Sequence, residues 1–450
     1  MQVRQVKKLP RDPGPAAWHK LLGEVPSYPP LEQDIHVDWL VIGGGFAGLS
    51  AARRLCQVRN GDKVCVIEAG RFGEGPAGRN SGFMIDLPHE LSSGEYAAGL
   101  DTDKKQIKLN RHAIDFALSA ARAYDMADEA VDPCGRINGA VDADGQHHNT
   151  SYAAHLSALG EAFETLDAAQ MKDITGSDFY TGGLFMPGAV LLQPAMYITE
   201  LAKGLAAEYA AMLTLYEQTP ALSFVQEKSK WVVKTPKGTI TADKIILCVN
   251  GHAESFGYYT GRLMHVFTYA SMTEALDPEQ IKALGGQSRW GITPSAPMGS
   301  TVRRISGVGG DRILIRNRWS YDPSMEVSEA RVARYGADQD KGFLRRFAQL
   351  ANVKMEYRWS GRLCLSRNSV PAFGMVEENI YSACCQNGLG TAKGTLAGIA
   401  AVDLATRSNS PVLQDLQSFD EPVKLPPKPI AWLGANAVLR WREWRSASEL

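Results

Sequence analysis

Residues 36–55, "HVDWLVIGGGFAGLSAARRL", limit the fold of this chain more than any other stretch. An apolar run over 38–42 ends in a glycine turn, and helix-forming residues follow it. Gly43 permits the tight turn, Gly45 lets the backbone approach a pyrophosphate, and Gly48 lets the helix pack on the strand. The spacing predicts a dinucleotide whose phosphates lie on a helix N-terminus, where free N–H groups favour negative charge.

The next segment completes a strand–helix–strand unit. An apolar strand is expected over 64–67, and it ends at Glu68. Glu68 follows Gly48 at about the separation at which a carboxylate accepts hydrogen bonds from the adenosine ribose. The same negative charge repels a 2′-phosphate, so NADP is disfavoured, whereas NAD and FAD both stay open at this point.

Composition narrows the class of protein and its partners. With 450 residues, 44% of them hydrophobic, the chain exceeds one compact domain, and we expect two lobes. Lys and Arg number 48 against 49 Asp and Glu, which argues against a basic surface for nucleic acid or an anionic membrane. We therefore expect a small-molecule partner.

Localisation and metal content follow from what the sequence lacks. The seven cysteines are scattered and fit neither a disulfide framework nor a metal site. No apolar run is long enough for a membrane span, and the first residues do not form a secretory signal. The sequence thus predicts a cytoplasmic protein with reduced thiols and no bound metal.

The segment after Glu68 separates FAD from NAD. It reads "AGRFGEGPAGRNSGFMIDLPHEL", a glycine-dense loop for which a nicotinamide domain has no use. A flavin extends past the second strand, and its ring needs close backbone approach and hydrogen-bond donors along its edge. The loop favours FAD.

The sequence "GRNSG" after "EA" resembles the glycine-rich loop of the FAD-dependent amine and amino-acid oxidoreductases, the superfamily of D-amino-acid, glycine and sarcosine oxidases. Within it, the chain is most similar to the γ-glutamylputrescine oxidase-like branch. Residues 219–251, 357–374 and 385–394 resemble later family segments in the same order. Together with the glycine turn, these matches are far more specific than one Gly-x-Gly-x-x-Gly motif.

The resemblance implies an α/β fold: a Rossmann-like FAD-binding domain of the glutathione-reductase type, and a second α+β substrate domain containing a mixed or antiparallel sheet. The implied division is an N-terminal arm (1–35), an FAD-binding domain (36–95, 180–260 and 350–410), a substrate domain (96–179 and 261–349) and a C-terminal tail (411–450). The tail contains three tryptophans, Trp432, Trp441 and Trp444. We expect it to dock on its own body or on a subunit, with a substrate-channel role as the alternative.

The glycine motifs and the resemblance together yield a set of candidate FAD-binding residues. They are Gly43, Gly45, Phe46, Ala47, Gly48, Glu68, Ala69, Arg79, Asn80, Ser81, Gly82, Ala221, Asn250, Gly251, Gly361, Gly388, Leu389, Gly390 and Thr391. Monomeric sarcosine oxidases attach FAD covalently through a cysteine near the position of Cys364, but the γ-glutamylputrescine oxidase-like branch lacks it. We therefore expect non-covalent FAD, with a covalent link through Cys364 as the alternative.

The resemblance implies oxidation of the C–N bond of an amine or amino acid. A hydride leaves the carbon beside the nitrogen, and water hydrolyses the resulting imine. O₂ is the expected acceptor, although the position of the oxygen-activating lysine of sarcosine oxidases holds Leu314 here, and Lys393 is only a possible substitute. A flavin dehydrogenase that reduces a protein or quinone, or a non-catalytic flavin-binding subunit, stays open, as does the oligomeric state.

Substrate anchors are expected from the second lobe, where arginine forks suit a carboxylate. Successive strand side chains point to opposite faces, so at most one of Arg303 and Arg304 faces the site. For each candidate residue a structural role competes with a role in substrate binding. The arginines could be solvated strand residues, the histidines could be structural, and the aromatic residue could lie in the core rather than in the wall of the substrate site. The substrate-site candidates are His89, His252, Arg303, Arg304, Arg316 and Trp319.

Overall fold

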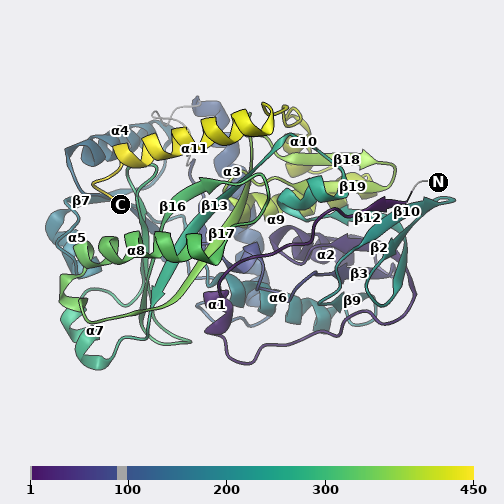
Figure 1. Cartoon of the computed structure of the whole chain (residues 1–450), viewed down its shortest axis with the longest axis horizontal. Coiled ribbons are helices and arrows are strands. Elements are labelled where there is room, and N and C mark those ends of the chain that lie inside the picture. The colour runs from purple at the N-terminus through teal and green to yellow at the C-terminus, as the bar shows by residue number, and fades with distance from the viewer. Residues whose placement is uncertain (1–2, 89–98) are drawn as a thin grey trace.

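The computed structural model of this chain describes residues 3–88 and 99–450. Two large sheets, one of nine strands and one of eight, organise the described residues. The candidate His89 lies outside them. Figure 1 shows the two sheets at opposite ends of the long axis, with helices packed against each.

The nine-stranded sheet has a parallel centre built on the strand that precedes the glycine turn. That strand, β2 (Ile35–Ile42), lies between β3 (Val64–Ile67) and β12 (Thr239–Leu247), and β9 (Leu213–Tyr216) follows β3. The apolar residues of β3 are all buried, as in the centre of a sheet covered on both faces. The other strands are β1 (Arg4–Gln5), β10 (Ser223–Glu227), β11 (Lys230–Lys234), β18 (Ala372–Glu377) and β19 (Ile380–Cys384).

Four helices form one hydrophobic cluster with this sheet: α2 (Phe46–Val58), α3 (Leu100–Ala123), α6 (Pro194–Glu208) and α9 (Gly390–Thr406). Helices α2 and α9 approach each other closely. A Cβ at Gly398 would lie 2.1 Å from the carbonyl oxygen of Ala47, so only glycine fits there. The close packing places the N-termini of both helices at the same edge of the sheet.

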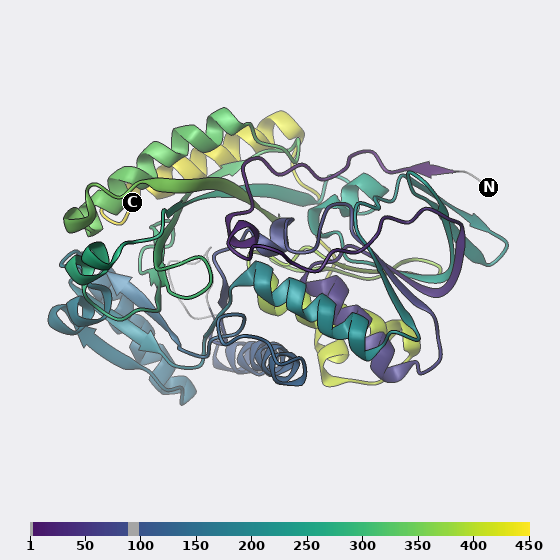
Figure 2. The same ribbon diagram turned by 90° about the horizontal axis from the view of Figure 1, so that it is seen from below.

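The eight-stranded sheet is antiparallel except where β14 pairs with β5. Its strands, in spatial order, are β17 (Met355–Ser366), β13 (Leu263–Thr273), β16 (Arg312–Tyr321), β15 (Thr301–Ile305), β14 (Trp290–Pro294), β5 (Arg136–Ala140), β7 (Gly182–Met186) and β6 (Glu164–Asp167). The accompanying helices are α4 (Ala143–Leu159), α5 (Ala168–Thr175), α7 (Pro278–Leu284), α8 (Glu329–Arg346) and α11 (Lys428–Arg445). In Figure 2, α8 and α11 run side by side along the outside of this sheet.

Both ends of the chain dock on the body. β1 pairs with β10, and Trp18 in α1 (Ala17–Lys20) is fully buried. At the other end, α10 (Pro411–Gln417) contacts α9, and α11 packs on β16. A separate two-stranded sheet pairs β4 (Phe83–Met84) with β8 (Val190–Leu191). Each of these strands connects, along the chain, a strand of one large sheet to a strand of the other. The tail therefore docks on its own chain, as one of the two expectations had it.

The predicted α/β class, with a Rossmann-like unit and a second mixed sheet, is confirmed. The strand over 64–67 has the predicted bounds. The division into domains stays a prediction, and two of its ranges cross between sheets: β7 and β17 join the eight-stranded sheet, although their residues were assigned to the FAD-binding domain. A buried strand has the same residue pattern in either sheet, so the sequence did not mark this crossing.

Candidate active site

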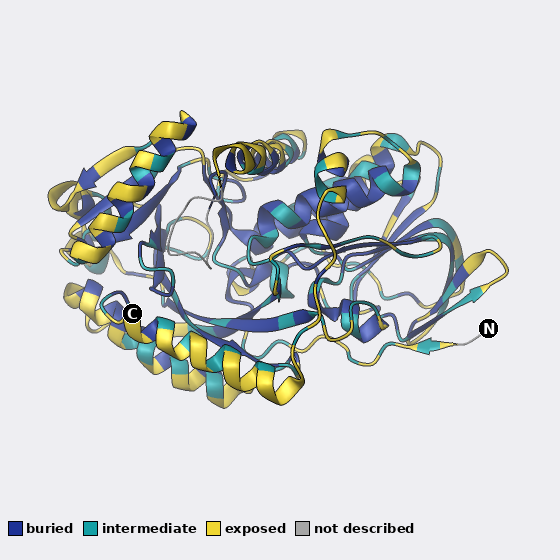
Figure 3. Ribbon diagram, turned by 90° about the horizontal axis from the view of Figure 1, so that it is seen from above, coloured by how far each residue is buried: buried dark blue, intermediate teal, exposed yellow. Residues whose placement is uncertain are grey.

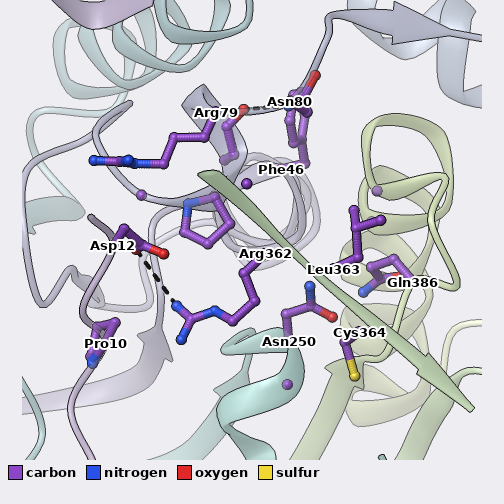
Figure 4. Close-up of a pocket in the computed structure, with 18 of the residues that line it drawn as sticks. Pro10, Asp12, Phe46, Arg79, Asn80, Asn250, Arg362, Leu363, Cys364 and Gln386 are labelled. Carbon is purple, nitrogen blue, oxygen red and sulfur yellow. Dashed lines mark hydrogen bonds and ion pairs between the residues drawn. The ribbon is translucent and has the colours of Figure 1, made fainter. Parts of the chain in front are cut away.

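A cavity of about 540 Å³ is lined by residues of both sheets. Figure 4 shows part of its wall, with Phe46 and Arg79 on one side and Leu363 and Gln386 on another. Nearly all the predicted FAD-binding residues line it. They are Gly43, Gly45, Phe46, Ala47, Glu68, Ala69, Arg79, Asn80, Ser81, Ala221, Asn250, Gly251, Gly361, Gly388, Leu389, Gly390 and Thr391.

The glycine turn forms one end of the cavity. Gly43 has φ +104°, and a Cβ there would lie 2.6 Å from the carbonyl oxygen of Cys248. Gly45 is the N-cap of α2 and lines the cavity, so the first N–H groups of the helix face the space beside it. Gly48 does not line the cavity, but a Cβ there would lie 1.8 Å from the carbonyl oxygen of Gly43. It packs the helix against the strand, as the sequence predicted.

Glu68 is held at this end by the backbone. Its carboxylate accepts hydrogen bonds from the N–H of Gly44 at 2.8 Å and from the N–H of Gly70 at 3.0 Å. Burial raises its pKa, while these two donors oppose that shift. A carboxylate has about four acceptor positions, so two backbone bonds leave capacity for the hydroxyl groups of a sugar.

The "GRNSG" loop is fastened from several directions. Trp359 donates its indole N–H to the carbonyl oxygen of Arg79 at 3.0 Å, and Trp18 donates to that of Asn80 at 2.9 Å. The Arg79 guanidinium donates to the carbonyl oxygens of Pro13 and Gly14, which ties the N-terminal arm to the loop. These bonds fix the loop backbone beside the cavity.

A second helix N-terminus faces the middle of the cavity. Gly388, with φ +84°, turns the chain into α9, and Gly390 begins the helix. A Cβ at Gly390 would meet no atom within 4 Å, because the residue borders open space. The Oε1 atom of Gln386 is buried there and has no hydrogen-bond partner among the described residues. The first turn of α9 supplies N–H donors and positive potential to this space.

The family model described as "FAD dependent oxidoreductase" (DAO) matches residues 38–404. The chain belongs to this family. The match covers the glycine turn, the eight-stranded sheet, the nine-stranded sheet apart from β1 and the start of β2, and nearly all of α9, and it ends before α10 and α11.

Individual proteins agree with that assignment. A probable oxidoreductase, OrdL, of Haemophilus influenzae is 28% identical over 393 residues, which cover 82% of this chain and 83% of that protein. The gamma-glutamylputrescine oxidoreductase of Escherichia coli is 26% identical over 415 residues, 89% of each chain. Among solved structures, glycine oxidase from Geobacillus kaustophilus has a TM-score of 0.68 at 18% identity, covering 87% of this chain and 99% of that one. The structural likeness supports the fold.

FAD is the cofactor of this enzyme, as predicted, and the cavity fits it. The fit rests on three observations: two helix N-termini border the same space, the Glu68 carboxylate retains acceptor capacity, and Gly390 leaves the middle of the cavity open. A flavin dinucleotide needs each of these, because it carries a sugar, a diphosphate and an extended ring.

The far end of the cavity contains a cation, the half-buried Arg316. Arg316 lines it, with its guanidinium 5.3 Å from the ring centre of Trp319, and makes no hydrogen bond or ion pair with the described residues. Burial lowers the pKa of Arg316 to about 10, so it stays charged at neutral pH. The hydroxyl of Thr301 and the indole N–H of Trp319 are also buried without partners among the described residues. Since Thr301 pairs with Arg316 across β15 and β16, these donors lie near one another.

The structure corrects the place of two substrate-site candidates, because neither Arg303 nor Arg304 lines this cavity. Arg303 donates to the carbonyl oxygens of Ser81 and Leu192, both at 2.8 Å, and so supports the glycine-rich loop. Arg304 points to the opposite face and pairs with Asp311 at 2.9 Å. Their donors are occupied by the protein itself. Gly82 also lies off the cavity, because it packs against Arg303.

His252 lines the cavity as a supporting residue. Its Nε2 atom lies 2.6 Å from a guanidinium nitrogen of Arg362, and its Nδ1 atom lies 3.1 Å from the hydroxyl of Ser255. Burial, and then the charge of Arg362, lower the pKa of His252 to about 3. The imidazole is therefore neutral at physiological pH and accepts from Arg362. This agrees with the structural interpretation of the histidine.

Sequence reasoning missed Arg362, and it missed that the predicted N-terminal arm lines the cavity. Arg362 follows the predicted Gly361 on β17 and lies 3.6 Å from the carboxylate of Asp12 in the arm (Figure 4). The arm also places Val6, Lys8, Leu9 and Pro10 along the cavity. Arg362 was detectable, because it lies inside a segment that resembles the family. Asp12 was not, because the arm precedes the matched segments and contains no motif.

Cys364 lines the cavity, but its surroundings do not favour a reactive thiol. It is buried beside Cys385, and burial raises its pKa well above the usual value. The thiolate is the nucleophilic form, so a raised pKa lowers its reactivity. The geometry supports non-covalent FAD over the alternative of a Cys364 link.

Proposed function

We propose that this chain oxidises the C–N bond of a primary or secondary amine that also carries a carboxylate, with O₂ as the acceptor and H₂O₂ as a product. The observation that carries the proposal is one continuous cavity that joins the dinucleotide turn to Arg316, which forms no hydrogen bond or ion pair with the described residues. The name of the Escherichia coli relative, gamma-glutamylputrescine oxidoreductase, supports an amine substrate.

The residues of the cavity divide into holding and positioning groups. The glycine turn and Glu68 would hold the adenosine diphosphate part of FAD, and the "GRNSG" loop and the first turn of α9 would border the flavin. When bound, FAD supplies the two-electron acceptor for a hydride from the carbon beside the nitrogen. Loss of that hydride and of one N–H proton leaves an imine, which water hydrolyses to a carbonyl compound and ammonia or an amine.

The chain's own contribution is orientation and desolvation. Arg316 would bind the carboxylate, with Thr301 and Trp319 as further donors, and so set the reacting carbon at a fixed distance from this anchor. Ile85, Ala270 and Leu314 line the cavity with apolar surface. Low polarity disfavours the ammonium form of the substrate, and a neutral amine is the form that releases a hydride.

An anaerobic screen of amines and amino acids tests this function through the absorbance of oxidised flavin. We expect bleaching by a carboxylate-bearing amine, and slower bleaching by its analogue without the carboxylate. If no amine or amino acid bleaches the holoenzyme, the function is wrong and a non-catalytic flavin-binding subunit becomes the better interpretation.

A second candidate is a dehydrogenase that passes electrons to a protein or quinone. Leu314 favours it, because an apolar residue lines the cavity where sarcosine oxidases carry an oxygen-activating lysine, and Lys393 is not among the lining residues. Turnover in air distinguishes the two: an oxidase forms one H₂O₂ per substrate, whereas the dehydrogenase forms little peroxide and reduces an artificial dye rapidly.

A further inference from the structure

Helix α11 turns two polar side chains, Asn436 and Glu443, toward the protein. The Asn436 amide accepts a hydrogen bond from the N–H of Tyr321 at 3.1 Å and donates to its carbonyl oxygen at 3.0 Å. Glu443 accepts from the N–H of Trp319 at 2.9 Å and pairs with Arg318 at 3.1 Å. On the same side of the helix, Ala431, Ala435 and Leu439 pack against a hydrophobic cluster of the eight-stranded sheet. The inward face of α11 is therefore partly apolar and partly polar, and its contacts with the protein do not use its large exposed apolar residues.

The outward face of α11 is apolar. Ile430 is 62% exposed, Leu433 63%, Trp441 53% and Trp444 73%. Their spacing of three, eight and three residues places them on one side of a helix, with the exposed Ala437 between them. Figure 3 shows this outer side of α11 exposed along its length. We call these five residues the α11 stripe.

The charges on this helix are of one sign where they meet solvent. Its basic residues are Lys428, Arg440, Arg442 and Arg445, and its one acidic residue, Glu443, is 2% exposed. Arg445 lies over the ring of Trp441, at 5.4 Å from its centre, and so adjoins the stripe. The near-zero net charge of the whole chain averages over such local surfaces, so it does not exclude a cationic one.

We propose that the α11 stripe binds the surface of an anionic lipid bilayer, with the helix lying in the plane of the headgroups. Exposed tryptophan and leucine flanked by arginine and lysine are the composition that partitions to this interface. The family match ends at residue 404, so α11 lies outside the matched residues. Among the described helices, none has the length and apolar character to cross a bilayer, so the contact would be peripheral.

The charge pattern disfavours a second copy of the chain as the occupant. A two-fold interface would place α11 against α11, and the described basic residues at its two ends would then face basic residues. An anionic surface neutralises them instead.

Flotation of the holoenzyme with lipid vesicles tests the proposal. We expect binding to vesicles that contain phosphatidylglycerol, and much weaker binding to vesicles of phosphatidylcholine alone. The double variant Trp441→Ser/Trp444→Ser should reduce the bound fraction at least about tenfold. Replacing both Lys428 and Arg445 by Gln should weaken binding to anionic vesicles roughly thirtyfold.

The matched control is Met375→Ser/Phe419→Ser, which removes two apolar side chains that are 61% and 43% exposed away from α11. It should bind vesicles like the unmodified chain. Equal FAD content in all variants shows that the fold is intact, and no catalytic readout enters the test. Absence of binding to anionic vesicles, or unchanged binding of the tryptophan variant, overturns the proposal. A dimer in sedimentation velocity that the tryptophan variant dissociates also overturns it, in favour of a second copy.

Discussion

The two ends of the cavity are built from different parts of the chain. The nucleotide end consists mainly of backbone, namely the glycine turn and the N-terminus of α2, together with the Glu68 carboxylate at the end of a strand. The substrate end consists of side chains from β13, β15 and β16, such as Arg316 and Trp319. Backbone sites impose strict residue types at fixed spacing, whereas side-chain sites accept many solutions. The residues of the nucleotide end can therefore be predicted from a sequence, whereas those of the substrate end cannot.

The largest effect should come from breaking the backbone end. In Gly48→Val, the added side chain meets the carbonyl oxygen of Gly43 at 1.8 Å, and backbone atoms cannot move aside cheaply. We expect a loss of more than about 4 kcal/mol in stability and purification without FAD. Flavin absorbance and thermal unfolding measure both.

The control for this variant is Gly434→Ala, which also lies in a helix but has no atom within 4 Å of an added Cβ. It should retain FAD and unfold at the same temperature or slightly higher, because alanine is the better helix former. Normal FAD content in Gly48→Val would contradict the close-packing role of this glycine.

The substrate end should fail without loss of cofactor. Replacing Arg316 by Leu removes the proposed carboxylate anchor, at a cost of about 3 kcal/mol. We expect kcat/KM to fall about 100-fold for a carboxylate-bearing amine, with FAD content unchanged and partial recovery in Arg316→Lys. Steady-state kinetics with a carboxylate-free analogue is the internal control, since its kcat/KM should change little. Equal losses for both substrates would remove Arg316 from carboxylate binding.

The same contrast explains which elements and site residues could be predicted from the sequence. The β2–α2–β3 unit and the turn into α9 were predicted in the right places, because Gly43, Gly48 and Gly388 each meet a geometric need for glycine. Arg303 and Arg316 had equal claims as strand arginines. Only the fold shows that Arg303 donates its hydrogen bonds to backbone carbonyl oxygens, whereas Arg316 lines the cavity. The arm residue Asp12 comes from 350 positions before Arg362, and no local pattern encodes such a contact.

A smaller effect links the substrate end to the last residues of the chain. Glu449 accepts hydrogen bonds from the hydroxyl of Ser295 at 2.6 Å and from the N–H of Ala296 at 3.0 Å, next to the cavity residues Pro294 and Pro297. Burial raises its pKa to about 7. The folded-state pKa therefore exceeds the unfolded value, and the folded chain favours the protonated carboxyl group. The contribution of Glu449 to the free energy of unfolding is complete at low pH and is lost as pH rises through about 7.

Thermal unfolding from acidic to mildly alkaline pH measures this dependence. We expect the unmodified chain to lose on the order of 3 kcal/mol over this range, and Glu449→Gln to lose less, because its amide does not ionise. KM measured at the same pH values tells whether ionisation of Glu449 also alters the cavity wall at Pro294 and Pro297. An identical pH slope in both proteins would show that Glu449 does not titrate in this range.

The smallest effect is expected at Cys364, which lines the cavity from β17. It follows Gly361 and Arg362 on β17, and its thiol is buried next to Cys385 with a raised pKa. Since formation of a covalent flavin link requires a reactive thiol, acid precipitation should leave FAD in the supernatant of both the unmodified chain and Cys364→Ser. Yellow colour that stays with the precipitate of the unmodified chain but not of the variant would establish the covalent alternative. It would also show that burial alone does not silence a thiol beside a bound flavin.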